Sequence, residues 1–147
     1  MLESLLIRNF ALFEEARIQF EAGLIVLTGE TGAGKSLVVD AVNFLCGARA
    51  DRDVIRADSA SAYVEGIFLI DGMPELQALL AEQSLEAEDG LLIVSRELTN
   101  KGRSVCRLNG MAFALSFVQE VTARLIDLHG QHEHQSLLHE KSHLKYL

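Results

Sequence analysis

The eight-residue run from Gly29 to Ser36, Gly-Glu-Thr-Gly-Ala-Gly-Lys-Ser, constrains the fold of this chain more than any other feature. The run matches the phosphate-binding loop pattern G-x-x-x-x-G-K-[ST] at every fixed position. Its glycines allow the backbone to curl so that successive N–H groups point at phosphate oxygens. The Lys35 ammonium would contact the outer phosphates, and the Ser36 hydroxyl would bind Mg²⁺. The run therefore predicts a nucleotide site, and we expect ATP and Mg²⁺ as its cofactors.

The segments on either side of the run support this interpretation. The apolar, β-branched run Leu24–Thr28 is typical of a buried strand. Residues 36–46 carry apolar side chains at helical spacing, and Gly47 would end that helix. The helix would direct the positive end of its dipole at the phosphates. The residues predicted to bind the nucleotide in this segment are Gly29, Glu30, Thr31, Gly32, Ala33, Gly34, Lys35, Ser36 and Leu37.

The rest of the chain alternates short apolar runs with turn residues such as Asn109-Gly110, which predicts strands with few helices. We expect an α/β P-loop fold in which a mixed sheet carries the phosphate loop at the end of one strand. An antiparallel β subdomain would be built from the N-terminal strands and the strands between Ala62 and Leu108. The predicted strands are residues 2–9, 16–20, 62–70, 90–98 and 104–108, and the predicted helices are residues 73–83 and 113–125.

Composition argues against several classes of protein. The net charge of −8 disfavours a freestanding nucleic-acid binder that acts through a basic surface. Cys46 and Cys106 follow no disulfide or metal-binding pattern, which fits a reducing cytosol. The N-terminus carries charged residues unlike a signal peptide, and no apolar run reaches the ~20 residues of a membrane span. We therefore expect a cytoplasmic protein without membrane contact.

A complete P-loop nucleotidase also needs an acidic residue that steadies Mg²⁺ at the end of an apolar strand. Asp71, after the apolar run Ile67–Ile70, is one candidate, and it would make the chain a stand-alone kinase or nucleotidase. The next three residues, Gly-Met-Pro, offer no second carboxylate as a base. We therefore favour a strand that ends in a turn at Asp71-Gly72. Asp127 is a weaker candidate because fewer apolar residues precede it.

Several parts of the chain resemble a known family. Residues 5–11 and 23–36 resemble the N-terminal lobe of SMC-like, ABC-type ATPase heads. Residues 45–50, Leu-Cys-Gly-Ala-Arg-Ala, and residues 127–135, Asp-Leu-His-Gly-Gln-His-Glu-His-Gln, resemble the RecN family of DNA-repair proteins. The resemblance implies that residues 1–147 are the N-terminal lobe of such a head. It also implies a coiled-coil arm and a C-terminal lobe beyond this sequence. That second lobe would carry the acidic magnesium ligand, the catalytic glutamate and the signature motif.

The resemblance further implies an ATPase that acts in DNA double-strand break repair and recombination. Its partners would be the C-terminal lobe of the same head, a second head in an ATP-sandwiched dimer, and DNA in the full-length protein. This lobe alone would bind Mg-ATP but hydrolyse little or none of it, because the catalytic glutamate lies in the other lobe. A third interpretation is an interaction module in which nucleotide binding only controls assembly. ATP turnover by the isolated chain would separate the stand-alone enzyme from the other two.

The resemblance assigns a role to one glutamine far from the phosphate loop. Gln131 would be the Q-loop residue that contacts Mg²⁺ and the attacking water, and Gln135 is the less favoured claimant. The catalytic residues would then be Lys35 and Gln131, and the magnesium ligands would be Ser36 and Gln131. The alternative is that Gln131 is a solvated loop glutamine. All five histidines lie within residues 129–143. A zinc site would usually add cysteines or carboxylates in a fixed pattern, so we expect no metal there.

Arg56 resembles the arginine that SMC heads place near the nucleotide or DNA. The alternative is a surface arginine paired with Asp53 or Asp58. Residues 9–11, Asn-Phe-Ala, would flank the adenine or ribose, although the phenylalanine could equally belong to the core. Arg56 is therefore included among the predicted nucleotide-binding residues.

Overall fold

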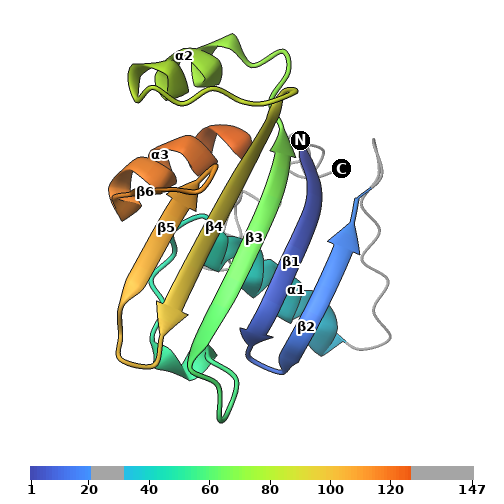
Figure 1. Cartoon of the computed structure of the whole chain (residues 1–147). Coiled ribbons are helices and arrows are strands. Elements are labelled where there is room, and N and C mark those ends of the chain that lie inside the picture. Colours follow the sequence, from blue (N-terminus) through green and yellow to red (C-terminus); the bar gives the residue numbers. More distant parts are fainter. Residues whose placement is uncertain (21–31, 127–147) are drawn as a thin grey trace, which may run out of the picture.

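The computed structural model of the chain describes residues 1–20 and 32–126, and for residues 32–35 the backbone only (Figure 1). A six-stranded sheet has the order β2-β1-β3-β4-β5-β6, and every pair of neighbouring strands is antiparallel. The strands are β1 (Leu2–Phe10), β2 (Phe13–Gln19), β3 (Ser61–Leu69), β4 (Leu91–Thr99), β5 (Ser104–Leu108) and β6 (Met111–Phe113). The helices are α1 (Gly32–Leu45), the 3-10 helix η1 (Arg52–Val54), α2 (Pro74–Glu82) and α3 (Leu115–Leu125).

The hydrophobic core lies between one face of the sheet and the helices α1 and α3, while α2 lies at the end where β3 finishes (Figure 1). Along residues 61–70, every second side chain is buried, which is the pattern of a strand with one face on the core. α1 contributes Val38, Ala41, Phe44 and Leu45 to this core. Their spacing places them on one face of the helix. The alternation of side chains along the strands and the helical period of α1 thus both direct apolar side chains into this core.

α1 ends in a Schellman motif, which confirms the predicted stop at Gly47. Gly47 has a φ of +99°, in the left-handed region that favours glycine. Its N–H donates to the Phe44 carbonyl at 3.1 Å, and the Ala48 N–H donates to the Asn43 carbonyl at 3.0 Å. These two hydrogen bonds satisfy carbonyls that the helix end would otherwise leave unpaired.

The predicted turn at Asn109-Gly110 is confirmed, because these residues have φ values of +48° and +86°. The turn leads into β6, a strand that the sequence analysis missed. Phe113 pairs with Cys106 in this strand, so the predicted helix start at Phe113 is wrong and α3 begins at Leu115. A strand of three residues is too short to display a period of two, and only its pairing with β5 reveals it.

The other strands and helices predicted within residues 1–20 and 32–126 are confirmed with small shifts of their ends. Pro74 lies in the first turn of α2, and Gly72 has a φ of +80°, as the predicted turn at Asp71-Gly72 requires. β2 starts at Phe13, before the predicted start at residue 16. The antiparallel subdomain is thus present within an α/β fold. The strand predicted for residues 24–28, which would give the sheet its mixed character, lies outside the described residues.

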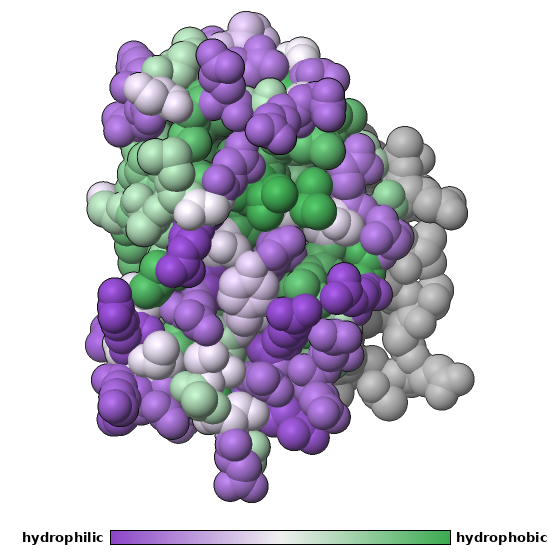
Figure 2. Space-filling model, viewed as in Figure 1, coloured by the Kyte–Doolittle hydropathy of each residue, from purple (hydrophilic) through white to green (hydrophobic). Residues whose placement is uncertain are grey.

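Figure 2 shows the face of the sheet opposite α1. Apolar side chains gather toward the α2 end, where Ile67 pairs with Ile93. Hydrophilic side chains dominate the other end (Figure 2). Two ion pairs belong to this charged end: Arg8 Nε lies 3.1 Å from Glu15 Oε1, and Arg17 Nε lies 3.8 Å from Glu15 Oε2. No helix in the described part of the chain has the length and apolar character to span a membrane. The charged end is also the end at which α1 begins (Figure 1).

Candidate nucleotide-binding site

The phosphate-loop motif leads directly into α1, so the backbone of residues 32–35 forms the first turn of that helix. This turn contains no acidic residue. A carboxylate in this turn would repel a phosphate, and none is present. The unpaired N–H groups and the positive end of the helix dipole are therefore suited to an anion. Ser36 is exposed and Leu37 is half-buried. An exposed hydroxyl at the end of the phosphate-loop motif suits a ligand of Mg²⁺ that would arrive with a nucleotide from solvent.

Part of the predicted site lies outside the described residues. For Gly32, Ala33, Gly34 and Lys35 the backbone is described but the side chains are not. The predicted residues for which the structure gives no position are Gly29, Glu30, Thr31, Gln131, Gln135 and the five histidines. The roles given to them in the sequence analysis stay predictions.

α1 begins at the end of the sheet where β1 turns into β2 (Figure 1). The loop before β3 reaches the same end, because its backbone pairs with the end of β1. The Ala11 N–H donates to the Val54 carbonyl at 2.6 Å, and the Arg56 N–H donates to the Asn9 carbonyl at 2.8 Å. The structure therefore brings Arg56 together with residues 9–11, the two segments for which the family resemblance implies a place near the nucleotide.

The turn between β1 and β2 has an unusual backbone. Asn9 and Ala11 have φ values of +51° and +53°, a region that residues other than glycine adopt rarely. Phe10 between them is only 2% exposed, and its ring centroid lies 5.4 Å from that of Phe44. Its ring thus belongs to the core and is not available to an adenine. Asn9 and Ala11 are half-buried and keep a surface that a ligand can contact.

Arg56 is half-buried, and no described carboxylate lies within ion-pair distance of it. The predicted alternative, a pair with Asp53 or Asp58, is therefore not formed. Its backbone is fixed at both ends, because its carbonyl accepts from the Ser59 N–H at 3.0 Å. A cation held in this way beside the end of β1 can attract a phosphate group.

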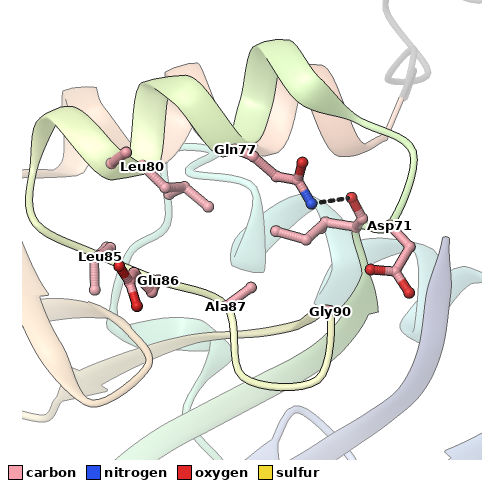
Figure 3. A pocket seen from close by; sticks show the side chains of 9 residues that line it. Asp71, Gln77, Leu80, Leu85, Glu86, Ala87 and Gly90 are labelled. Carbon is pink, nitrogen blue, oxygen red and sulfur yellow. Dashed lines mark hydrogen bonds between the residues drawn. The ribbon is translucent and has the colours of Figure 1, made fainter.

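Asp71 lies in the loop between β3 and α2, at the opposite end of the sheet from the start of α1 (Figure 1). It lines a groove of about 240 Å³ beneath α2, in which Gln77 Nε2 donates to the Ile70 carbonyl at 3.3 Å (Figure 3). The remaining lining residues are Leu80, Ala81, Leu85, Glu86, Ala87 and Gly90. A carboxylate that steadies the ion held by Ser36 must lie beside that hydroxyl. The position of Asp71 therefore argues against a stand-alone kinase or nucleotidase.

Arg96, which was not among the predicted site residues, is the one charged residue in the described part of the chain that is buried. It lies on β4, where Leu92, Val94 and Leu98 share the inward face with it. The signal in the sequence was an arginine at an inward position of an alternating strand. Such a position requires a partner for the charge inside the protein.

Two cysteines lie near this arginine, the buried Cys106 and the half-buried Cys46. Burial raises the pKa of Cys46 to about 12, although a hydrogen bond with Thr122 acts to lower it. Burial also raises the pKa of Cys106, against the attraction of the Arg96 cation for a thiolate. Both thiols therefore stay protonated at neutral pH and are poor nucleophiles. In residues 1–20 and 32–126, no group of three or more His, Cys, Asp or Glu residues could hold a metal ion.

Known proteins share the sequence pattern of this chain. The family model described as an AAA domain matches residues 4–105. The chain is 42% identical over 147 residues to the DNA repair protein RecN of Halalkalibacterium halodurans and 41% identical over 147 residues to that of Bacillus subtilis. Each match covers 100% of this chain and 26% of the relative. The chain thus spans about a quarter of the length of these curated relatives.

Solved structures share the fold. A chain from a study of ATP-driven dimerization and DNA-stimulated activation of SMC ATPases superposes with a TM-score of 0.69 at 20% identity, covering 93% of this chain and 90% of that chain. The SMC head domain from Thermotoga maritima gives a TM-score of 0.61 at 24% identity, covering 81% of this chain and 41% of that chain. At these identities the likeness concerns the fold alone.

Proposed function

Since the chain belongs to the AAA-domain family and is the N-terminal lobe of a RecN-type ATPase head, we propose that it binds ATP. In this proposal it does so as part of an SMC-like ATPase that acts in DNA double-strand break repair and recombination. The observation that carries the proposal is the phosphate-loop motif at the start of α1. The solvent-exposed Ser36 and the absence of acidic residues from the first turn support it.

In this proposal each residue has a defined task. The backbone N–H groups of Gly29 to Ser36 hold the phosphates, and Lys35 adds a positive charge at the outer ones. Ser36 and Gln131 hold Mg²⁺, which when bound neutralises charge on the phosphates. Arg56 contacts the nucleotide or DNA from the loop beside α1, together with the backbone of Asn9 and Ala11.

The proposed partners are the C-terminal lobe of the same head, a second head in an ATP-sandwiched dimer, and DNA. The net charge of −8 argues that DNA contacts are local or come from other parts of the complete protein. The proposed location is the bacterial cytosol or nucleoid, where the DNA lies.

We expect the isolated chain to hydrolyse ATP at least about 10³-fold more slowly than the complete protein, because it lacks the catalytic glutamate and the opposing head that complete the site in the proposal. A steady-state phosphate-release assay on both proteins, at matched and high concentration, measures the difference. Asp71→Asn should change neither rate. Strong turnover by the isolated chain that Asp71→Asn abolishes would instead establish a self-contained nucleotidase.

A second expectation concerns Gln131. An amide can coordinate Mg²⁺ through its oxygen while its NH₂ group donates to a water. In the complete protein, Gln131→Ala should leave the affinity for ATP nearly unchanged and lower kcat by roughly 10- to 100-fold, because water positioning matters mainly in the transition state. Binding and turnover are measured on the same preparation, with Gln135→Ala as the matched control. An unchanged kcat for Gln131→Ala and a lowered one for Gln135→Ala would transfer the role to Gln135.

A further inference from the structure

Arg96 is buried on the inward face of β4 with 3% of its surface exposed. No described carboxylate lies within ion-pair distance of it. Burial lowers the pKa of Arg96, yet an arginine in a protein stays protonated at neutral pH. A buried cation is costly unless other groups replace the water around it. The residues that do so here indicate what Arg96 does.

The partners of Arg96 lie at the C-terminal end of α1. Its Nη1 atom donates to the Phe44 carbonyl at 2.8 Å and to the Ala48 carbonyl at 2.6 Å, and its Nε atom donates to Ser104 Oγ at 3.1 Å. The guanidinium carbon also lies 4.4 Å from the centroid of the Phe44 ring. A helix end carries unpaired carbonyls and the negative end of the dipole, so a planar cation with several donors is well suited to it.

α3 holds the same end of α1 from another side. Gln119 Nε2 donates to the Gly47 carbonyl at 2.8 Å. The single hydroxyl proton of Thr122 is shared between the Val118 carbonyl of α3 at 2.9 Å and the Cys46 carbonyl at 3.2 Å. The C-terminal end of the phosphate-loop helix is therefore anchored by side chains from β4 and from α3. Arg96 is the only one of these anchors that also carries a charge.

We propose that Arg96 is a positioning residue for nucleotide binding: it fixes the C-terminal end of α1 on the sheet and thereby sets the place of the first turn of that helix, which carries the last residues of the phosphate-loop motif. The inference rests on the proposed function, namely that this loop binds Mg-ATP. α1 has 14 residues and is a stiff rod of roughly 20 Å. Movement at its anchored end is therefore carried to the turn that holds the phosphates.

The test compares Mg-ATP affinity with stability in the complete protein. Arg96→Met keeps an unbranched side chain of similar length but loses the charge and all three hydrogen bonds. We expect it to weaken the affinity for a fluorescent ATP analogue by about tenfold, a typical coupling between two sites, at a temperature where circular dichroism shows it fully folded. Arg96→Lys keeps the charge but not the planar set of donors, so it should lie between Arg96→Met and the wild type.

A matched control separates positioning from general destabilisation. Leu80→Ala removes a side chain that is 1% exposed in α2, at the other end of the sheet, and should destabilise the fold without changing ATP affinity. Wild-type affinity in a folded Arg96→Met variant would overturn the inference. If Arg96→Met does not fold, wild-type affinity in a folded Arg96→Lys variant would overturn the inference instead.

A further variant distinguishes failure of this inference from failure of the proposed function. If Lys35→Ala weakens binding but folded Arg96 variants do not, only the positioning role falls. If Lys35→Ala binds ATP as the wild type does, the proposed nucleotide site itself falls. A loss of affinity in Leu80→Ala equal to that in Arg96→Met would also overturn the positioning role, because the effect would then follow stability alone.

Discussion

Replacement of Lys35 by alanine is expected to lower the affinity of the complete protein for Mg-ATP by roughly 10- to 150-fold. The substitution removes a charge-assisted contact to the outer phosphates, and hydrogen bonds to charged groups contribute about 1.5–3 kcal/mol. Titration with a fluorescent ATP analogue measures the change. Because the lysine follows the glycines of the motif at residues 29–36, the loss should be greater for ATP than for AMP, which lacks the outer phosphates.

Lys101→Ala provides the matched control, because Lys101 is an exposed lysine in the turn between β4 and β5. It removes the same charge from the protein and should leave ATP affinity unchanged. Equal affinities of the wild type and Lys35→Ala would contradict the nucleotide site that the motif predicts. Equal losses of ATP affinity in both lysine variants would show that the change in net charge causes the loss.

Gly47→Ala is expected to lower the free energy of unfolding by about 2–5 kcal/mol, which is large for the addition of one methyl group. The φ of +99° disfavours any residue with a Cβ atom by roughly 1–2 kcal/mol. The new methyl group would also overlap Gln119 Cγ, and such overpacking costs about 1–3 kcal/mol. Urea-induced unfolding followed by circular dichroism measures the loss.

Gly102 separates the two causes. Its φ of +88° is similar, but a Cβ atom there would meet no other atom within 4 Å. Gly102→Ala should therefore show only the backbone cost. In a Gln119→Ala background, the additional cost of Gly47→Ala should fall to the value at Gly102, a coupling that a double-mutant cycle detects. The same cost at both glycines in the wild-type background would refute the overlap with Gln119.

Much of the fold could be predicted because its signals are local. Burial of every second residue along β3 follows from the alternation of its side chains, and the stop of α1 follows from a single glycine with a left-handed backbone. β6 could not be predicted, since three residues show no period and the strand exists only through its pairing with β5. Phe113 was therefore assigned to a helix although it lies in a strand.

The candidate site likewise has a part that a local motif predicts and a part that depends on contacts between distant residues. Sequence by itself was enough to predict the phosphate-loop chemistry, because the motif is contiguous from Gly29 to Ser36 and would act through its own backbone and side chains. Only the tertiary structure decided which distant residues join the start of α1 and which do not. Arg56 meets residues 9–11 at the end of β1, whereas Asp71 lies at the opposite end of the sheet from the start of α1. Arg96 reaches the C-terminal end of α1 because the register of β4 on β3 places it opposite Val64, on the part of the sheet over which that helix end lies. Such contacts join residues far apart in the chain, and no local pattern encodes them.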